Sequence, residues 1–117
     1  MTVKGRPGPD PDQMIVSTLH TVATRRWEPL TGPDREAAMA ELRAVAGGRM
    51  DLVIQAAGVI LGSRPPDEHD PRYLQHAYGA ELLLELAGVE TDAPEVQAWA
   101  AVGRERRTRG RGPVQHR

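Results

Sequence analysis

The sequence predicts an all-α fold, a small four- to five-helix domain of bundle-like or orthogonal arrangement around a buried central helix. The first observation is the stretch of 11 residues at 51–61, DLVIQAAGVIL, whose apolar residues fall on every side at helical spacing, with Gln55 as the one clearly polar interruption after the first residue. A helix that is apolar all round is a buried helix, and this one is far shorter than the roughly 20 residues that cross a bilayer. The second observation is that apolar residues recur every three or four positions on both sides of it. The third is the length of 117 residues, which suits one domain.

The chain is expected to divide into a disordered leader over residues 1–9, a single helical domain over residues 10–107 and a disordered basic tail over residues 108–117. The core available to the domain is modest. Val, Ile, Leu and Met together number 27, Ala numbers 15, and Phe is absent. Small side chains bury little area each, so we expect a stability near the low end of the usual range of about 5–15 kcal/mol. Self-association would add buried surface.

The first helix is predicted to begin at Asp10 and Pro11 and to end near Arg26. Aspartate accepts hydrogen bonds from the free amides of a first helical turn, and proline suits the first helical position. The helix is expected to stop where Glu28 precedes Pro29, because proline disfavours the helical conformation in the residue before it.

The second helix is predicted over residues 34–46 and the third over residues 49–62, separated by a pair of glycines. Glycine takes up the positive φ that the end of a helix often needs. The third helix contains the apolar stretch, and its residues Val53, Ile54 and Ala57 are expected to be nearly inaccessible to solvent.

A fourth helix is predicted over residues 71–87, with Asp70 as its cap and Pro71 in its first turn. Glu81 and Glu85 lie one turn apart and mark its solvent side. The residues expected to face the core are His76, Gly79, Ala80, Leu83, Leu86 and Ala87, with Leu82 and Leu84 flanking them.

This projection leaves two large side chains outside the core, beside the glutamates of the fourth helix. The candidate partner contact therefore consists of Leu74, Tyr78, Glu81 and Glu85. Tyrosine at such an edge supplies contact area at low entropy cost, with its hydroxyl satisfied at the rim. The alternative is that these are scattered surface residues without a partner, as is common on soluble proteins.

A fifth helix is predicted from a cap at Thr91 or Asp92, through Pro94 in its first turn, to about Arg107. Charge is distributed unevenly between this region and the rest of the chain. Residues 1–103 carry nine basic and fifteen acidic groups, a net charge of −6, whereas residues 104–117 carry six Arg and one Glu, a net charge of +5.

The basic segment is a candidate for nucleic-acid contact through phosphates, without preference for base sequence. The residues concerned are Arg104, Arg106, Arg107, Arg109 and Arg111. Two other outcomes stay open: the segment folds back onto the acidic body, or it is solvated and contacts nothing in particular.

Two segments carry a resemblance to known proteins, namely ELRAVAGGRMDLVIQAAGVILG and EVQAWAAVGRERR. They resemble a group of short, uncharacterised actinobacterial helical proteins, in which an AVAGGR-type turn precedes an apolar helix and a tryptophan-containing last helix runs into arginines. The resemblance covers about residues 34–107. Its motifs are structural, and it implies no activity for any residue.

The sequence offers no constellation of catalytic, cofactor-binding or metal-ligating residues. The absence of Cys removes thiolate catalysis, disulfides and cysteine zinc sites, and it fits a reducing compartment. Asp67, Glu68, His69 and Asp70 concentrate possible metal ligands, but neighbours on a proline-flanked loop cannot all face one ion. His76 is expected to be a partly buried histidine bonded to a backbone carbonyl rather than a catalytic base.

We therefore expect a small non-enzymatic cytoplasmic protein that serves as a protein-protein interaction or regulatory module, with no cofactor and no membrane contact. It would act on a protein partner or by self-association. The alternative is a nucleic-acid-associated accessory protein that uses the Arg-rich C-terminal segment. A recognition helix exposes polar side chains to base edges, and the helix over residues 49–62 exposes almost none, which argues against sequence-specific DNA reading.

Overall fold

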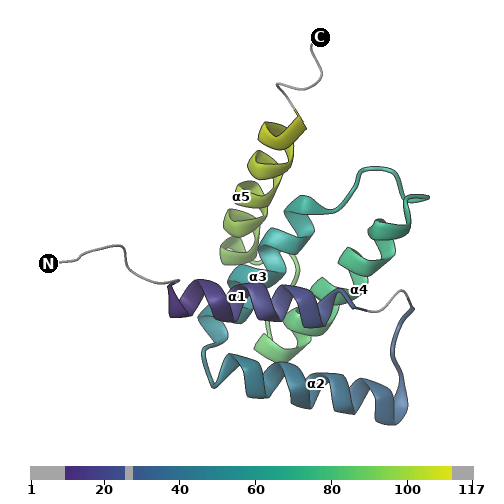
Figure 1. Ribbon diagram of the computed structural model, residues 1–117, viewed down its shortest axis with the longest axis vertical. Coiled ribbons are helices and arrows are strands. Elements are labelled where there is room, and N and C mark those ends of the chain that lie inside the picture. The colour runs from purple at the N-terminus through teal and green to yellow at the C-terminus, as the bar shows by residue number, and fades with distance from the viewer. Residues whose placement is uncertain (1–9, 26–27, 112–117) are drawn as a thin grey trace, which may run out of the picture.

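The computed structural model describes residues 10–25 and 28–111 of the chain, with side chains given as far as Thr108 (Figure 1). This part of the chain is built from helices and contains no strand, which confirms the predicted all-α fold. The helices are α1 (Pro11–Ala23), α2 (Gly32–Ala46), α3 (Met50–Ser63), α4 (Pro71–Ala87) and α5 (Pro94–Arg111).

Two helix starts follow the predicted Asp-Pro pattern. The carboxylate of Asp10 accepts a hydrogen bond from the backbone amide of Asp12 at 3.0 Å, and Asp70 accepts one from Arg72 at 3.0 Å. Because each carboxylate satisfies an amide that has no partner within its helix, α1 and α4 begin at fixed residues. The last turns of α2 and α4 are closed by glycines with positive φ, Gly47 at 58° and Gly88 at 71°.

The end of α1 was predicted wrongly, because the helix stops at Ala23 rather than near Arg26. Thr24 donates hydrogen bonds to the carbonyl of His20 from its hydroxyl, at 2.7 Å, and from its backbone amide, at 3.0 Å. Thr24 is the cap of the helix, with φ −95° and ψ 15°, outside the helical values. Its hydroxyl bond does not itself end the helix, because Thr18 and Thr21 make the same bond within α1. Arg26, near which the helix was predicted to end, lies outside the described residues.

The end of α5 was predicted wrongly in the other direction. The helix continues to Arg111, so residues 108–111 belong to the helical part and not to a disordered tail. Arginine is a strong helix former, and no proline interrupts the run before residue 113. The predicted leader over residues 1–9 and the remaining tail over residues 112–117 lie outside the described residues.

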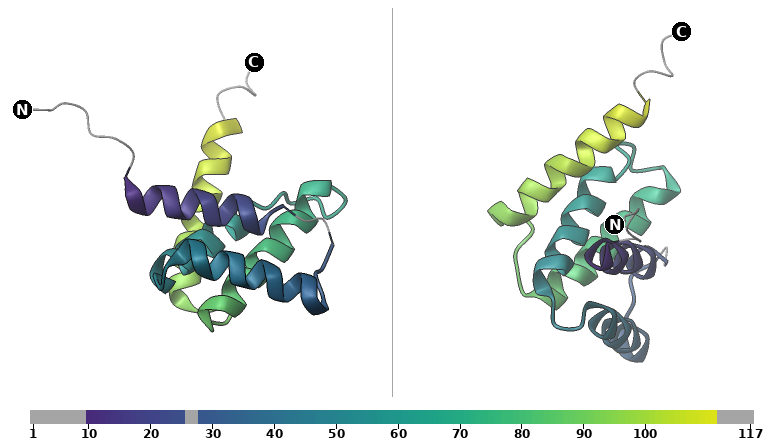
Figure 2. Two further views of the ribbon diagram at one scale, coloured as in Figure 1. Left: turned by 60° about the horizontal axis from the view of Figure 1, so that its bottom comes forward. Right: turned by 60° about the vertical axis from the view of Figure 1, so that its left-hand side comes forward.

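The central element is α3, which contacts each of the other four helices (Figures 1 and 2). Helix α1 crosses α3 and also contacts α2 and α4, whereas α5 runs alongside α3 and packs against no other of the described helices. The all-round apolar sequence of α3 fits this position, because helices pack against it on several sides.

The core forms where α1, α2, α4 and α5 meet α3. Its largest fully buried side chains are Leu19, Leu42, Val53, Ile60, Leu83 and Val96. Val53 and Ala57 are inaccessible, as predicted, but the prediction for Ile54 was wrong, since that side chain is only partly buried. Ile54 and Leu61 are two turns apart on one side of α3, and both are only partly covered. This side of the helix is the one that its neighbours leave incompletely enclosed.

Small residues bring α3 and α5 unusually close together. A Cβ atom added at Gly62 would overlap the carbonyl oxygen of Ala100 and lie 2.8 Å from the backbone nitrogen of Arg104. A Cβ atom at Gly103 would lie 2.5 Å from the carbonyl oxygen of Val59. The two backbones therefore touch at positions where any side chain would push the helices apart.

Within the described residues, no single helix combines the length and the apolar content needed to cross a membrane. Helices α2 and α3 meet that test only when joined, and the chain bends by 116° between them.

We predict that Gly62→Ala destabilises the domain. Alanine would contribute about 1 kcal/mol through helix propensity, but overpacking against backbone atoms costs more, so we expect a net loss of about 1–3 kcal/mol in the free energy of unfolding. Urea denaturation followed by circular dichroism measures it. Ala98→Gly, on the exposed side of α5, is the control and should lose only the propensity difference. A Gly62→Ala protein as stable as the parent would contradict the close packing of α3 and α5.

Candidate protein interaction groove

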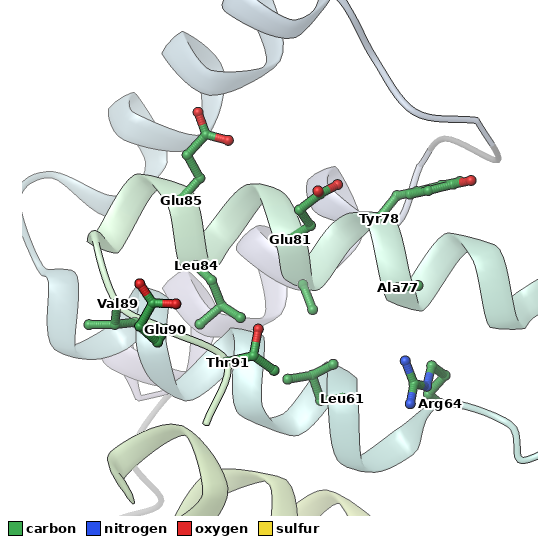
Figure 3. Close-up of a pocket in the computed structure, with 11 residues that line it drawn as sticks. Leu61, Arg64, Ala77, Tyr78, Glu81, Leu84, Glu85, Val89, Glu90 and Thr91 are labelled. Atoms are coloured by element: carbon green, nitrogen blue, oxygen red, sulfur yellow. The ribbon is translucent and has the colours of Figure 1, made fainter. Parts of the chain in front are cut away.

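An open groove of about 500 Å³ lies between α3 and α4 and is closed at one end by the connection from α4 to α5 (Figure 3). Its floor is apolar and consists of Leu61, Ala77, Ala80, Leu84 and Val89. Leu84 descends from α4 and Leu61 rises from α3 into the space between the two helices. This is the side of α3 on which Ile54 and Leu61 are only partly covered.

The rim of the groove is polar and mostly acidic. Tyr78, Glu81 and Glu85 stand along the outer edge of α4, and Glu90 lies where the chain leaves that helix (Figure 3). Arg64 at the end of α3 is the one basic residue of the lining. Its guanidinium lies over the ring of Tyr73, 4.6 Å from the ring centre, and not among the three carboxylates.

The three carboxylates of the rim differ in their partners. Glu85 forms an ion pair with Arg35 of α2, which holds the two helices together at the groove's edge. For Glu81 and Glu90 no ion pair is found within the described part of the chain. Two exposed carboxylates beside an apolar floor thus have no ion-pair partner among the residues that the structure describes.

Three of the four residues predicted as a partner contact line this groove, namely Tyr78, Glu81 and Glu85. Leu74 does not line it. It lies one turn before Tyr78 on α4, and 41% of its surface is exposed. Tyr78 is half-buried rather than fully outside the core.

The inner face of α4 is broader than predicted. Ala80 and Leu83 are buried as expected, but Leu82 and Leu84 are buried as well, and Leu86 is only partly so. Helix α4 is covered by α1, α2 and α3, which together enclose more than one stripe.

The predicted nucleic-acid contacts lie on the last turns of α5. Arg104 and Arg106 are exposed, whereas Arg107 is half-buried. The Nε atom of Arg107 is shielded from solvent and has no hydrogen-bond partner among the described residues. The helix backbone continues through Arg109 and Arg111, but the structure does not describe the side chains of these two residues.

Arg107 borders a second cleft, of about 490 Å³, beside the loop from α3 to α4. Asp67, Asp70 and Arg72 share this cleft, but Asp70 is already engaged. Its carboxylate caps α4 and binds the guanidinium of Arg72 at 2.8 Å, and these hydrogen bonds lower the pKa of Asp70 to about 2. A carboxylate held in this way is not available as a proton donor or acceptor near neutral pH.

The acidic and histidine side chains of that loop, for which no metal site was predicted from the sequence, also make local contacts. The carboxylate of Asp67 accepts a hydrogen bond from the backbone amide of His69 at 2.9 Å and lies 3.3 Å from its Nδ1. Among the residues that the structure describes, no group of three His, Asp or Glu side chains is placed to hold a metal ion.

Two histidines meet between α1 and α4. The ring of His20 stands edge-on to that of His76, with 5.9 Å between the ring centres. Nδ1 of His76 donates to the carbonyl of Arg72 at 2.7 Å, which is the backbone bond predicted for it. His20 also borders a small cleft of about 240 Å³ together with Ser17 and Arg106, but no hydrogen bond joins His20 to Ser17 within the described residues. Ser17 and His20 therefore lack the hydrogen bond that would join a catalytic nucleophile to its base.

Comparisons with protein-family models, with curated proteins and with solved structures find no match to this chain. The resemblance of residues 34–107 to short actinobacterial proteins therefore stays a prediction.

We predict that acid weakens the domain through His20. Burial lowers the pKa of His20, and the neighbouring His76 lowers it further. The unfolded chain takes up a proton near pH 6.5, whereas the folded chain takes it up only at lower pH, so stability is fully present above that pH and falls as the pH drops below it. The measurement is the urea midpoint between about pH 7.5 and 5. His20→Gln should flatten this dependence, and the control His69→Gln, on the exposed loop, should leave it unchanged. A parent whose midpoint is constant across this range would contradict the prediction.

Proposed function

We propose that this protein is a small non-enzymatic interaction module, and that the groove between α3 and α4 binds an amphipathic helix of a basic protein partner. The observation that carries the proposal is the combination of an apolar floor with the carboxylates of Glu81 and Glu90, which have no ion pair within the described part of the chain. A helix laid into such a groove would bury its apolar side chains against Leu61 and Leu84 and set its basic side chains opposite the rim. The cysteine-free sequence suits the cytoplasm as its place of action.

The dimensions of the groove support a helical occupant. Tyr78 and Glu85 on the rim are seven residues apart along α4, which corresponds to about 10.5 Å at the usual 1.5 Å per residue. This length is close to the diameter of a helix, and also to the length of two helical turns. The groove is open along this edge, so an occupant needs no entry path through the core. The negative charge of the rim would mainly speed association and select a partner of positive charge. It would contribute less to affinity.

The groove's preference for a basic helix over an acidic one can be tested with two synthetic amphipathic helices, one of Leu and Lys and one of Leu and Glu. We expect the Lys peptide to bind in fluorescence anisotropy and the Glu peptide not to bind. Reversing charge with Glu81→Lys and Glu90→Lys should weaken binding of the Lys peptide at least tenfold, since repulsion replaces attraction, while high salt should weaken binding to the parent.

The matched control carries Glu28→Lys and Glu68→Lys, which change the net charge equally at exposed sites away from the groove. It should keep most of the parent's affinity. If both double variants lose affinity equally, overall charge decides binding and the groove does not. If neither peptide binds the parent, the proposed occupant is wrong.

A second candidate function is nucleic-acid association through the basic end of α5. The observation in its favour is that α5 stays helical to Arg111 and presents Arg104 and Arg106 to solvent. Contacts of this kind neutralise phosphates, release counterions and carry no base specificity.

This candidate predicts binding of any duplex at low salt, with an affinity that falls linearly in log–log plots against salt concentration. Replacing Arg104, Arg106, Arg109 and Arg111 with Gln should abolish the shift in a gel. The control is the Glu28→Lys and Glu68→Lys protein, which should bind at least as well as the parent. Binding that does not respond to salt, or no binding at low salt, would remove this candidate.

A further inference from the structure

The small cleft beside His20 lies between α1 and α5. Both helices rest on α3, which α1 crosses and α5 accompanies (Figure 2). The apolar part of the cleft, of about 240 Å³, is Val16 and Val59, and its polar part comes from two helices: Gln13, Ser17, His20 and Thr21 of α1, and Arg106 of α5. It shares no lining residue with the groove between α3 and α4, so it is a separate site.

The polar side chains of this cleft offer hydrogen-bond donors that the chain itself does not use. Gln13, Ser17 and His20 follow one another at intervals of four and three residues, which places them on one face of α1. Within the described residues, no hydrogen bond is found from these three side chains or from the guanidinium of Arg106. The hydroxyl of Thr21, by contrast, donates to the carbonyl of Ser17 at 3.0 Å.

The cleft carries a positive charge and no carboxylate among its described lining residues. Arg106 has no ion pair in the part of the chain that the structure describes, and its guanidinium stays charged at every pH of interest. The neighbouring Asp12 of α1 does not line the cleft, because its carboxylate accepts hydrogen bonds from Arg49 at 3.2 Å. A surplus of donors around a positive charge favours an anionic ligand.

The size of the cleft and the placement of its donors favour a phosphate group. Pockets for organic ligands usually measure about 300–1,000 Å³, so this smaller cleft suits one compact group. A phosphate group accepts hydrogen bonds through several oxygens in a tetrahedral arrangement, and it can therefore be held from α1 and α5 at once. A carboxylate has two oxygens in one plane, which a single guanidinium satisfies.

We propose that this cleft binds a phosphate group, supplied by inorganic phosphate or by a small phosphate ester, with Arg106 on one side and Gln13, Ser17 and His20 on the other. The proposal is independent of the groove between α3 and α4. A bound phosphate group would join α1 to α5, two helices that do not contact each other directly within the described residues. The end of α5 would then be held by two helices in place of one.

The test is an NMR titration of the full chain with sodium phosphate and, separately, with glycerol phosphate, at an ionic strength kept constant with NaCl. Both probes should shift the amide signals of residues 13–21 and 103–107 saturably and leave those of residues 81–90 in place. Arg106→Gln should weaken binding at least tenfold, because it removes the charge-assisted hydrogen bonds, and Ser17→Ala should weaken it several-fold.

The matched control is Arg104→Gln, which removes the same charge from an exposed arginine of α5 outside the cleft. It should bind both probes as the parent does. Ser17, Arg104 and Arg106 are all exposed, so each variant should melt like the parent. As a second measurement, phosphate should slow deuterium exchange of the amides of α5 in the parent but not in Arg106→Gln.

Three results would overturn the proposal. The first is the absence of saturable shifts with either probe at millimolar concentrations. The second is an equal loss of affinity in Arg106→Gln and Arg104→Gln, because net charge and not the cleft would then decide binding. The third is binding of duplex DNA at these residues while both phosphate probes stay silent, since α5 would then serve nucleic acid alone. A tighter fit of one probe supports the proposal and identifies the source of the phosphate group.

Discussion

The packing of α3 against all four other helices is the constraint on which the rest of the structure depends, and its most extensive contact is the one with α5. Gly62 and Gly103 let the two helices approach until the backbone of each meets the other, as at the carbonyls of Val59 and Ala100. Dispersion forces act only at contact distance, so this close approach compensates for side chains that are individually small. This domain has no Phe, and Ala is among its commonest residues. Close packing of the helices therefore takes the place of large buried side chains.

The central position of α3 explains both the burial and the groove. Four helices contact α3, yet four helices do not enclose it evenly, and the side that carries Ile54 and Leu61 is only partly covered. The groove floor is the exposed remainder of the core at that side. Its apolar character therefore follows from the fold, whereas its acidic rim follows from the outer residues of α4 and the turn after it.

Most of the fold could be predicted because local chemistry decides it. Asp-Pro pairs begin α1 and α4, glycines close α2 and α4, and the all-round apolar stretch is the buried helix. The errors arose where no strong signal marks a boundary. Helix α1 ends at Ala23 with Thr24 as its cap, and α5 continues through the arginines to Arg111, since no proline comes before residue 113.

Part of the candidate site could be found in the same way. The outer side of α4 follows from helical periodicity, which gives Tyr78, Glu81 and Glu85. Leu61 and Arg64 could not be found, because they belong to a different helix and periodicity does not say which helices become neighbours. The partial exposure of Ile54 was missed for the same reason, since a pattern that is apolar all round does not reveal which side has the weakest cover.

The attachment of α5 through α3 alone has a consequence for local opening. A helix held by one interface can separate as a unit, while α1 to α4 remain packed on one another. Its amides would then exchange with deuterium at a rate governed by that interface and not by global unfolding. Trp99, half-buried beside Gly58, lies on this interface and would pass into water as the helix departs. The last helix therefore carries its own fluorescent reporter of a motion that the remaining four helices need not share.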